Sequence, residues 1–92
     1  MPKTINKRRR IIFSLEAPHA KEVILMADFN NWDKKTHPMK QDKNGFWDKI
    51  VIIPPGRYEY KFLVDEEWWH DPKNQEVCYN KHGTLNSVIT VD

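Results

Sequence analysis

Short apolar runs, separated by turn-forming residues roughly every 8–12 positions, constrain the fold of this chain more than any other feature. The clearest run is 57–64, where the two tyrosines and Phe62 fall on one face while Glu59 and Lys61 fall on the other. No stretch repeats apolar residues at helical spacing for long enough to form a helix. The same patterns predict strands over 8–15, 23–27, 46–53, 57–64, 68–70 and 86–91. We therefore predict an all-β chain that folds as an antiparallel β-sandwich of about six or seven strands.

The length of the chain sets its domain organisation. Ninety-two residues are enough for one thin but independent core, so 1–92 is expected to be a single domain with residues 1–6 frayed. The segment 34–44 shows no regular period, and 73–83 is expected to be a loop. A sandwich this small offers a face or a rim rather than the deep cleft in which polysaccharides are hydrolysed.

The cysteine content and the N-terminal residues indicate a compartment. Cys78 is the single cysteine, which excludes an internal disulfide and fits a reducing environment. The polar and basic segment 1–10 is followed by only three apolar residues, whereas a secretory signal needs about 7–15 and a membrane helix about 20. We expect a soluble, cytoplasmic protein with no membrane partner.

Histidine, serine and glycine, which often form catalytic or phosphate-binding motifs, are present, but their spacing matches none of these motifs. The four histidines have no metal-ligand spacing, and Ser14 and Ser87 lie inside strand patterns without a nucleophile elbow. The three glycines are too far apart to form a phosphate-binding loop. We therefore expect a protein that is not an enzyme, with no catalytic residues, no metal and no cofactor.

A basic run, Lys-Arg-Arg-Arg at 7–10, has two interpretations. It fits a charged edge strand that discourages pairing with another sheet, and it also fits a contact with nucleic acid or an anionic membrane. The net charge is only +2 and no second basic cluster reinforces the run. We favour edge protection and expect no nucleic-acid partner.

Aromatic residues make up 12 % of the chain, more than a core this small easily absorbs. Trp32 follows the polar segment 28–31, so it either folds back onto the end of the sandwich or presents a flat ring to a ligand. Trp68 and Trp69 are neighbours on one predicted strand and must point to opposite faces, so at least one is expected at the surface. Lys61 faces away from the core side of its strand and is either solvated or a hydrogen-bond donor beside these rings.

Together these side chains form a candidate sugar-binding face. A flat ring suits the C–H face of a pyranose, and lysine and asparagine donors suit its hydroxyl groups. Because an open site covers only one face of the sugar, its binding free energy is expected to be on the order of −4 to −8 kcal/mol.

Four segments stand in the order 23–32 (VILMADFNNW), 55–65 (PGRYEYKFLVD), 68–72 (WWHDP) and 83–88 (GTLNSV). They resemble the glycogen-binding domain of AMP-activated protein kinase β subunits, and with it the N-terminal modules of isoamylases and branching enzymes in carbohydrate-binding family forty-eight. The resemblance covers nearly all of the chain beyond the first ten residues. It implies an immunoglobulin-like sandwich of the early-set type that binds α-1,4-linked glucans such as glycogen and starch without hydrolysing them.

The resemblance also assigns roles within the site. By their places in the motifs, Trp32 and Trp68 become the stacking rings, while Lys61 and Asn86 become donors to sugar hydroxyls. His82 stands where the family has a leucine that inserts into the curl of the glucan, and an imidazole there can pack or form hydrogen bonds. With Trp68 in the site, Trp69 is expected to pack against the core.

The chain departs from the family at three further places. Glu66 replaces a glycine in the turn before the binding tryptophan, and if that position needs a positive φ the change either costs roughly 1 kcal/mol or reshapes the loop. Ala27 stands where glycine is frequent, which we interpret as a packing difference. The loop 73–82 is one residue longer than in the kinase domain.

Two functions remain open. The first is a glucan-binding module that targets or regulates a partner, such as a glycogen-metabolising enzyme or a kinase-type complex. The second is a protein-interaction or regulatory subunit on the same fold, with vestigial sugar binding. The first function is favoured because the chain keeps all four residues to which the resemblance assigns sugar contacts: Trp32, Lys61, Trp68 and Asn86.

Overall fold

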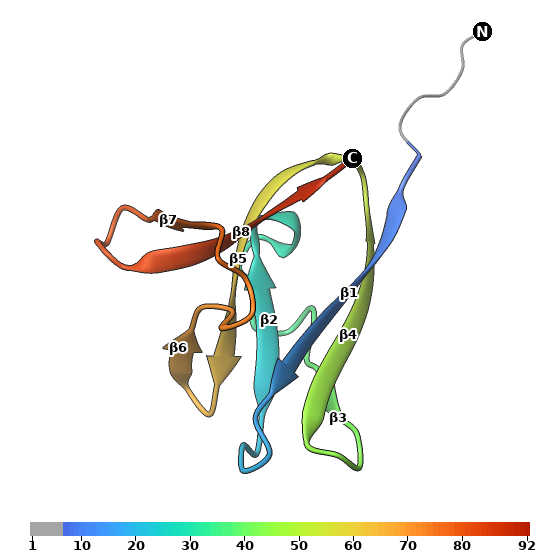
Figure 1. The fold of residues 1–92 in the computed structure, drawn as a ribbon, viewed down its shortest axis with the longest axis vertical. Helices are drawn as coiled ribbons and strands as arrows, with labels where there is room; N and C mark the ends of the chain where they lie inside the picture. The colour runs from blue at the N-terminus through green and yellow to red at the C-terminus, as the bar shows by residue number, and fades with distance from the viewer. Residues whose placement is uncertain (1–6) are drawn as a thin grey trace, which may run out of the picture.

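Strands form where the sequence alternates or runs apolar, and the computed structural model describes residues 7–92 (Figure 1). Within this part the elements are β1 Arg9–Glu16, β2 Val23–Ala27, the 3₁₀ turn η1 Asp28–Asn30, β3 Lys40–Gln41, β4 Phe46–Ile53, β5 Gly56–Val64, β6 Glu67–Trp69, β7 Val77–Tyr79 and β8 Leu85–Val91. The predicted frayed segment 1–6 lies outside the described residues.

The strands form two antiparallel sheets. One has the order β1-β4-β3; the other has the order β2-β5-β8-β7, with β6 paired to the end of β5. β8 pairs with the first half of β5 and β6 with its last three residues, so β5 is the central strand of the larger sheet. The predicted antiparallel β-sandwich is confirmed.

Two short strands were not expected from the sequence. β7 lies inside the segment 73–83 that the sequence predicts to be a loop, and it pairs with β8 through Val77↔Ser87 and Tyr79↔Leu85. β3 lies inside the segment 34–44, which shows no regular period, and pairs with β4. The prediction of a loop without a strand over 73–83 was wrong, because strands this short are held by their neighbours rather than by a pattern of their own.

The core lies between the two sheets and is built from alternate residues. Tyr60 and Phe62 of β5 point inward, and the Tyr60 ring meets Phe13 of β1 edge-on at 4.9 Å between centroids. Phe62 is fully buried. Tyr60 also donates a hydrogen bond from Oη to Asp71 at 2.7 Å, and burial raises the pKa of its hydroxyl well above the usual value. Inward-facing positions of β5 therefore hold the sandwich together.

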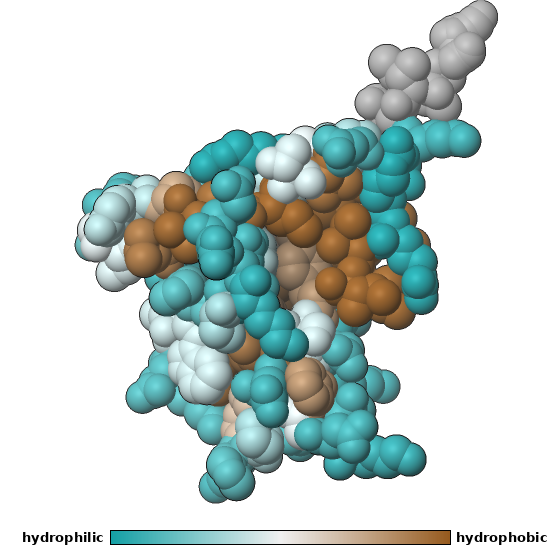
Figure 2. Space-filling view, in the orientation of Figure 1, coloured by the Kyte–Doolittle hydropathy of each residue, from teal (hydrophilic) through white to brown (hydrophobic). Residues whose placement is uncertain are grey.

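The basic run begins an edge strand. Among the described residues β1 pairs with β4 alone, and Arg9 and Arg10 are exposed. Exposed charges on an edge strand discourage pairing with the strand of another sheet, as expected from the sequence. The outer face of this sheet also exposes a cross-strand pair, Ile12 and Ile50. Figure 2 shows apolar surface next to β1. Within residues 7–92 no helix is long and apolar enough to span a membrane.

The outer face of the larger sheet carries a second, smaller apolar cluster. Ile24 and Met26 of β2 pack there with Leu63 of β5, and Trp32 covers them from the loop after η1. Lys61 lies directly opposite Met26 in the β2–β5 register. This cluster is the floor on which the site is built.

Candidate functional site

An open cleft of about 920 Å³ lies over the outer face of the larger sheet. Its walls come from the segment after β2, from β5, from β6 and from the β7–β8 hairpin. All five side chains that the sequence singled out line this one cleft: Trp32, Lys61, Trp68, His82 and Asn86. They come from four separate segments, so only the fold brings them together.

The wall that carries Trp32 is held by a buried asparagine. Asn30 Oδ1 accepts hydrogen bonds from the backbone N–H of Ala27 at 3.0 Å and of Trp32 at 3.1 Å. Asn31 and Trp32 have φ of 58° and 56°, a left-handed conformation that few residues adopt without such support. Trp32 Nε1 donates to Asp28 Oδ1 at 3.0 Å, which fixes the plane of the ring. The tryptophan neither folds into the main core nor projects freely.

Asn30 also forms a hydrogen bond with His37, which makes the stability of the domain depend on pH. Asn30 Nδ2 lies 2.8 Å from His37 Nδ1 and donates to it when that nitrogen carries no proton. Burial lowers the pKa of His37 from its usual 6.5, with a further contribution from the charge of Lys49. The unfolded chain therefore binds more protons just below pH 6.5, so we expect the free energy of unfolding to fall as pH drops below about 6.5 and to level off below the folded pKa.

Urea denaturation at pH 7.5 and pH 5.5 measures this fall. His37→Gln keeps a hydrogen-bond acceptor but does not titrate, so it is expected to reduce the difference between the two pH values. His19→Gln, at an exposed position, is the matched control and should retain it. An undiminished difference in His37→Gln would show that another group is responsible.

The two adjacent tryptophans point in opposite directions. Trp68 is 51 % exposed and lines the cleft, whereas Trp69 is partly buried and packs against the main core. This confirms the expected division between them. The Trp68 ring meets Trp32 edge-on, with 6.3 Å between centroids and 62° between planes, so two rings set at an angle form one aromatic corner.

The turn that precedes Trp68 has a backbone that favours glycine. Asp65 and Glu66 have φ of 47° and 72°, the combination of a tight hairpin turn with both central residues left-handed. The carboxylate of Asp65 accepts from the backbone N–H of Lys21 at 2.9 Å and of Glu22 at 2.8 Å. Glu66 therefore occupies a positive-φ position, which is the condition under which replacing a glycine there carries a cost. Its exposed carboxylate lies 4.0 Å from Lys34 Nζ on the opposite wall.

Glu66→Gly is expected to stabilise the domain by about 0.5–1 kcal/mol, because relief of the left-handed strain outweighs the freedom that glycine adds to the unfolded chain. An exposed ion pair at this distance offsets little of the gain. For a domain of this size the melting temperature should rise by roughly 2–8 °C. Glu67→Gly, one residue on and inside β6, should instead lower it. A lower melting temperature in both variants would contradict the strain at Glu66.

Lys61 is more buried than a surface lysine. Its exposure is 7 %, and Nζ donates to Thr84 Oγ1 at 3.1 Å while lying 5.8 Å from the centroid of the Trp68 ring. Burial lowers the pKa of its ammonium group. Of the two interpretations open from the sequence, simple solvation is excluded, and the ammonium is held at the floor of the cleft beside the exposed ring.

Asn86 and Glu59 form a polar pair beside Lys61. Asn86 Nδ2 donates to Glu59 Oε1 at 3.0 Å, and Asn86 Oδ1 accepts from Asn80 Nδ2 at 3.0 Å. The hydrogen bond from Asn86, followed by the Cys78 thiol and by Arg57, holds the pKa of Glu59 below its usual range. Glu59 is therefore an anionic acceptor within the cleft.

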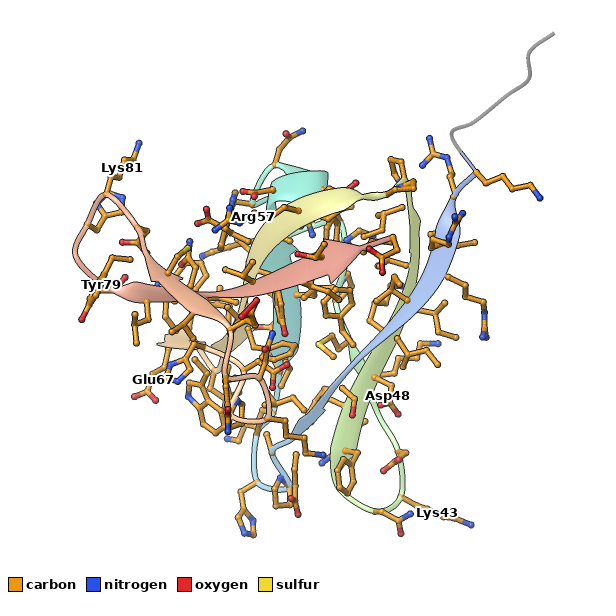
Figure 3. The ribbon with its side chains drawn as sticks, turned by 45° about the horizontal axis from the view of Figure 1, so that its top comes forward. Lys43, Asp48, Arg57, Glu67, Tyr79 and Lys81 are labelled. Carbon is orange, nitrogen blue, oxygen red and sulfur yellow. The ribbon has the colours of Figure 1, made fainter. Side chains whose placement is uncertain are left out.

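The β7–β8 hairpin forms the remaining wall, and Figure 3 shows Tyr79 and Lys81 at its projecting end. Asn80 Oδ1 accepts from the backbone N–H of His82 at 2.9 Å and of Thr84 at 3.1 Å, which shapes the tip of the hairpin. Tyr79 is 77 % exposed. The side of the cleft that closes over Lys61 is thus a loop ordered by its own asparagine.

Several lining residues were not singled out from the sequence: Met26, Asp28, Lys34, Glu59, Tyr79, Asn80, Lys81 and Thr84. For two of them a signal existed. Glu59 shares the outward face of its strand with Lys61, and Thr84 stands two residues before Asn86. Among residues 7–92 no cluster of three or more His, Cys, Asp or Glu side chains could hold a metal ion.

Comparison with known proteins identifies the family of this chain. The family model for the glycogen recognition site of AMP-activated protein kinase matches residues 11–92. The chain belongs to this family. A glycogen-recognition domain is a binding module rather than a catalytic domain, so the expectation of a non-enzymatic protein is confirmed, and the resemblance noted from the motifs is confirmed with it.

Relatives of this glycogen-recognition domain include β-1 subunits of 5′-AMP-activated protein kinase. The Sus scrofa subunit is 44 % identical over 71 residues, which cover 77 % of this chain and 55 % of the relative. The Bos taurus subunit is 44 % identical and the Homo sapiens subunit 41 % identical, each over 77 % of this chain and 25 % of the relative. The chain thus spans between a quarter and about half the length of these curated relatives.

Proposed function

We propose that the cleft is the glucan-binding site of this glycogen-recognition domain, and that it binds α-1,4-linked glucan, as in glycogen, starch or maltooligosaccharides. The observation that supports this most is the convergence of Trp32, Lys61, Trp68, His82 and Asn86 on one open cleft. The two rings set at an angle offer apolar faces to successive glucosyl units of a curved chain, because an α-1,4 linkage turns each unit relative to the last.

Hydrogen bonds would complete the recognition. Lys61 Nζ keeps donor capacity beyond its bond to Thr84, and the Asn86 amide lies next to it with Glu59 as a neighbouring acceptor. His82 would pack against the sugar from the hairpin side. The two carboxylates that line the cleft, Asp28 and Glu59, accept hydrogen bonds from the protein itself, and the function we propose is binding.

The relatives extend the proposal to a partner. Because they are named as subunits of a protein kinase, we propose that this module couples glucan binding to a kinase-type complex or to another glycogen-metabolising enzyme. The proposal places it in the cytoplasm, where Cys78 stays a free thiol.

Calorimetric titration with maltoheptaose and with β-cyclodextrin tests the function, and a cello-oligosaccharide of similar length is the control. Saturable binding of the α-linked ligands alone is expected, with a Kd between about 1 μM and 1 mM. Because these sugars are neutral, the Kd should change little between 50 and 500 mM salt.

A pair of lysine variants locates the binding. Lys61→Gln is expected to weaken maltoheptaose binding, whereas Lys43→Gln, in the exposed turn before β4, should not. The absence of saturable binding at millimolar ligand, or equal binding of cello-oligosaccharide, would overturn the proposal in favour of a protein-interaction subunit.

A further inference from the structure

The cationic side chains of the cleft exceed what a neutral sugar requires. Three lysines, Lys34, Lys61 and Lys81, line it together with His82, against two carboxylates. Lys81 and His82 stand side by side at the tip of the β7–β8 hairpin, and both are exposed. Within residues 7–92 neither has an acidic side chain within ion-pair distance.

The two carboxylates of the cleft are already engaged by donors of the protein. Asp28 accepts from Trp32 Nε1 at 3.0 Å and from the backbone N–H of Glu59 at 2.8 Å. Glu59 accepts from Asn86 at 3.0 Å and pairs with Arg57 at 3.2 Å. Within residues 7–92 neither carboxylate forms an ion pair with a lysine of the cleft, and the charge of Glu59 is paired with Arg57.

Lys61 is the most informative of these cations because it is buried. Its hydrogen-bond partner is the neutral hydroxyl of Thr84, and no carboxylate of residues 7–92 lies within 4.0 Å of Nζ. An ammonium group taken out of water without an opposite charge is unfavourable, and burial accordingly lowers the pKa of this one. The Trp68 ring, 5.8 Å from Nζ, attracts the ammonium weakly but carries no opposite charge. An anionic group on the ligand would supply that charge.

We infer that the cleft prefers an α-glucan that carries a phosphate monoester, with Trp32 and Trp68 holding the glucosyl units and Lys61, Lys81 and His82 surrounding the phosphate. The inference rests on the proposed glucan binding and names the ligand class more closely. A phosphate monoester carries a charge of about −1.5 to −2 at pH 7 and three strong acceptor oxygens, which matches ammonium and imidazole donors. Lys34 also lines the cleft, but the Glu66 carboxylate lies 4.0 Å from its Nζ.

The test compares maltoheptaose with maltoheptaose that carries a single 6-phosphate, by calorimetry in 50 mM and in 500 mM salt. At 50 mM salt the phosphorylated ligand is expected to bind at least about 10-fold more tightly. At 500 mM salt this advantage should shrink to about 2-fold or less, because screening acts on the phosphate contacts and not on the stacking. Equal affinities at 50 mM salt would overturn the inference.

Two variants that each remove one positive charge separate the cleft from the overall charge of the protein. Lys81→Gln is expected to lower the ratio of the affinity for the phosphorylated ligand to the affinity for maltoheptaose severalfold. Lys43 lies at the opposite end of the molecule from the β7–β8 hairpin, as the labels in Figure 3 show. Lys43→Gln should therefore retain the preference for the phosphorylated ligand. An equal loss in both variants would show general charge attraction and contradict the assignment to the cleft.

The remaining arms separate the possible failures. Inorganic phosphate alone is expected to bind far more weakly than the phosphorylated glucan; comparable binding would indicate a simple anion site and overturn the inference. If neither glucan binds, the proposed function itself fails. If both bind equally and Trp68→Ala abolishes both, the proposed function stands and only the preference for phosphate is wrong.

Discussion

Trp68→Ala is expected to weaken maltoheptaose binding about 10- to 100-fold and to change the free energy of unfolding by less than about 1 kcal/mol. Trp68 is half exposed and contributes mainly to the cleft, so its removal leaves the main core intact. Burying on the order of 100 Å² of apolar surface between ring and sugar corresponds to about 2.5 kcal/mol, a substantial part of the roughly 4–8 kcal/mol expected for an open sugar site. Calorimetry and urea denaturation measure the two effects separately.

The neighbouring tryptophan supplies the control. Trp69→Phe keeps an aromatic ring packed against the core and leaves the cleft unaltered, so maltoheptaose binding should persist. Trp32→Ala should lose binding as Trp68→Ala does, with a larger loss of stability because Trp32 also covers Ile24 and Met26. Unfolding of the domain by Trp68→Ala, or retention of binding in that variant, would place the site elsewhere.

Phe62→Ala is expected to lower the free energy of unfolding by about 3–5 kcal/mol. The side chain is fully buried and its ring contacts Tyr60 edge-on at 5.9 Å, so alanine would leave a cavity between the two sheets. Domains have about 0.05–0.15 kcal/mol of stability per residue, so a loss of this size removes a large part of the stability of this one. A shift of the urea midpoint, read by circular dichroism, measures it.

A matched control lies on the other sheet. Ile52→Ala removes a comparable apolar side chain at a position that is 58 % exposed, and should change the free energy of unfolding by no more than about 0.5 kcal/mol. Similar losses in Phe62→Ala and Ile52→Ala would mean that burial between the sheets does not dominate the stability.

The long strands could be predicted from the sequence because each carries its own pattern. β4 was predicted with the bounds found, Phe46–Ile53, and β5 differs by one residue at Gly56. The short strands β3 and β7 could not be predicted. Val77–Tyr79 has no alternation that distinguishes it from a loop, and it becomes a strand only because β8 offers an edge with which to pair.

Five residues that line the cleft could be singled out from the sequence, but their burial and their neighbours could not. Motifs singled out Trp68, yet the residues alone could not say which of Trp68 and Trp69 is exposed, since that depends on which side of β6 faces the core. The burial of Lys61 was likewise hidden, because the groups that cover it, Trp68 and Thr84, come from other strands. The local alternation of apolar and polar residues predicts which face of the sheet a side chain lies on, whereas its burial depends on segments far away in the sequence.

The alternation along β5 has a consequence for how such a domain can evolve. Tyr60 and Phe62 belong to the interior, while Glu59 and Lys61, on the intervening positions, line the cleft. A one-codon deletion within this strand would exchange the two sets and destroy fold and recognition together. Point substitutions at the outward positions leave the interior untouched. Selection can therefore change the preferred ligand through alternate codons of a single strand, while the codons between them remain constrained by folding.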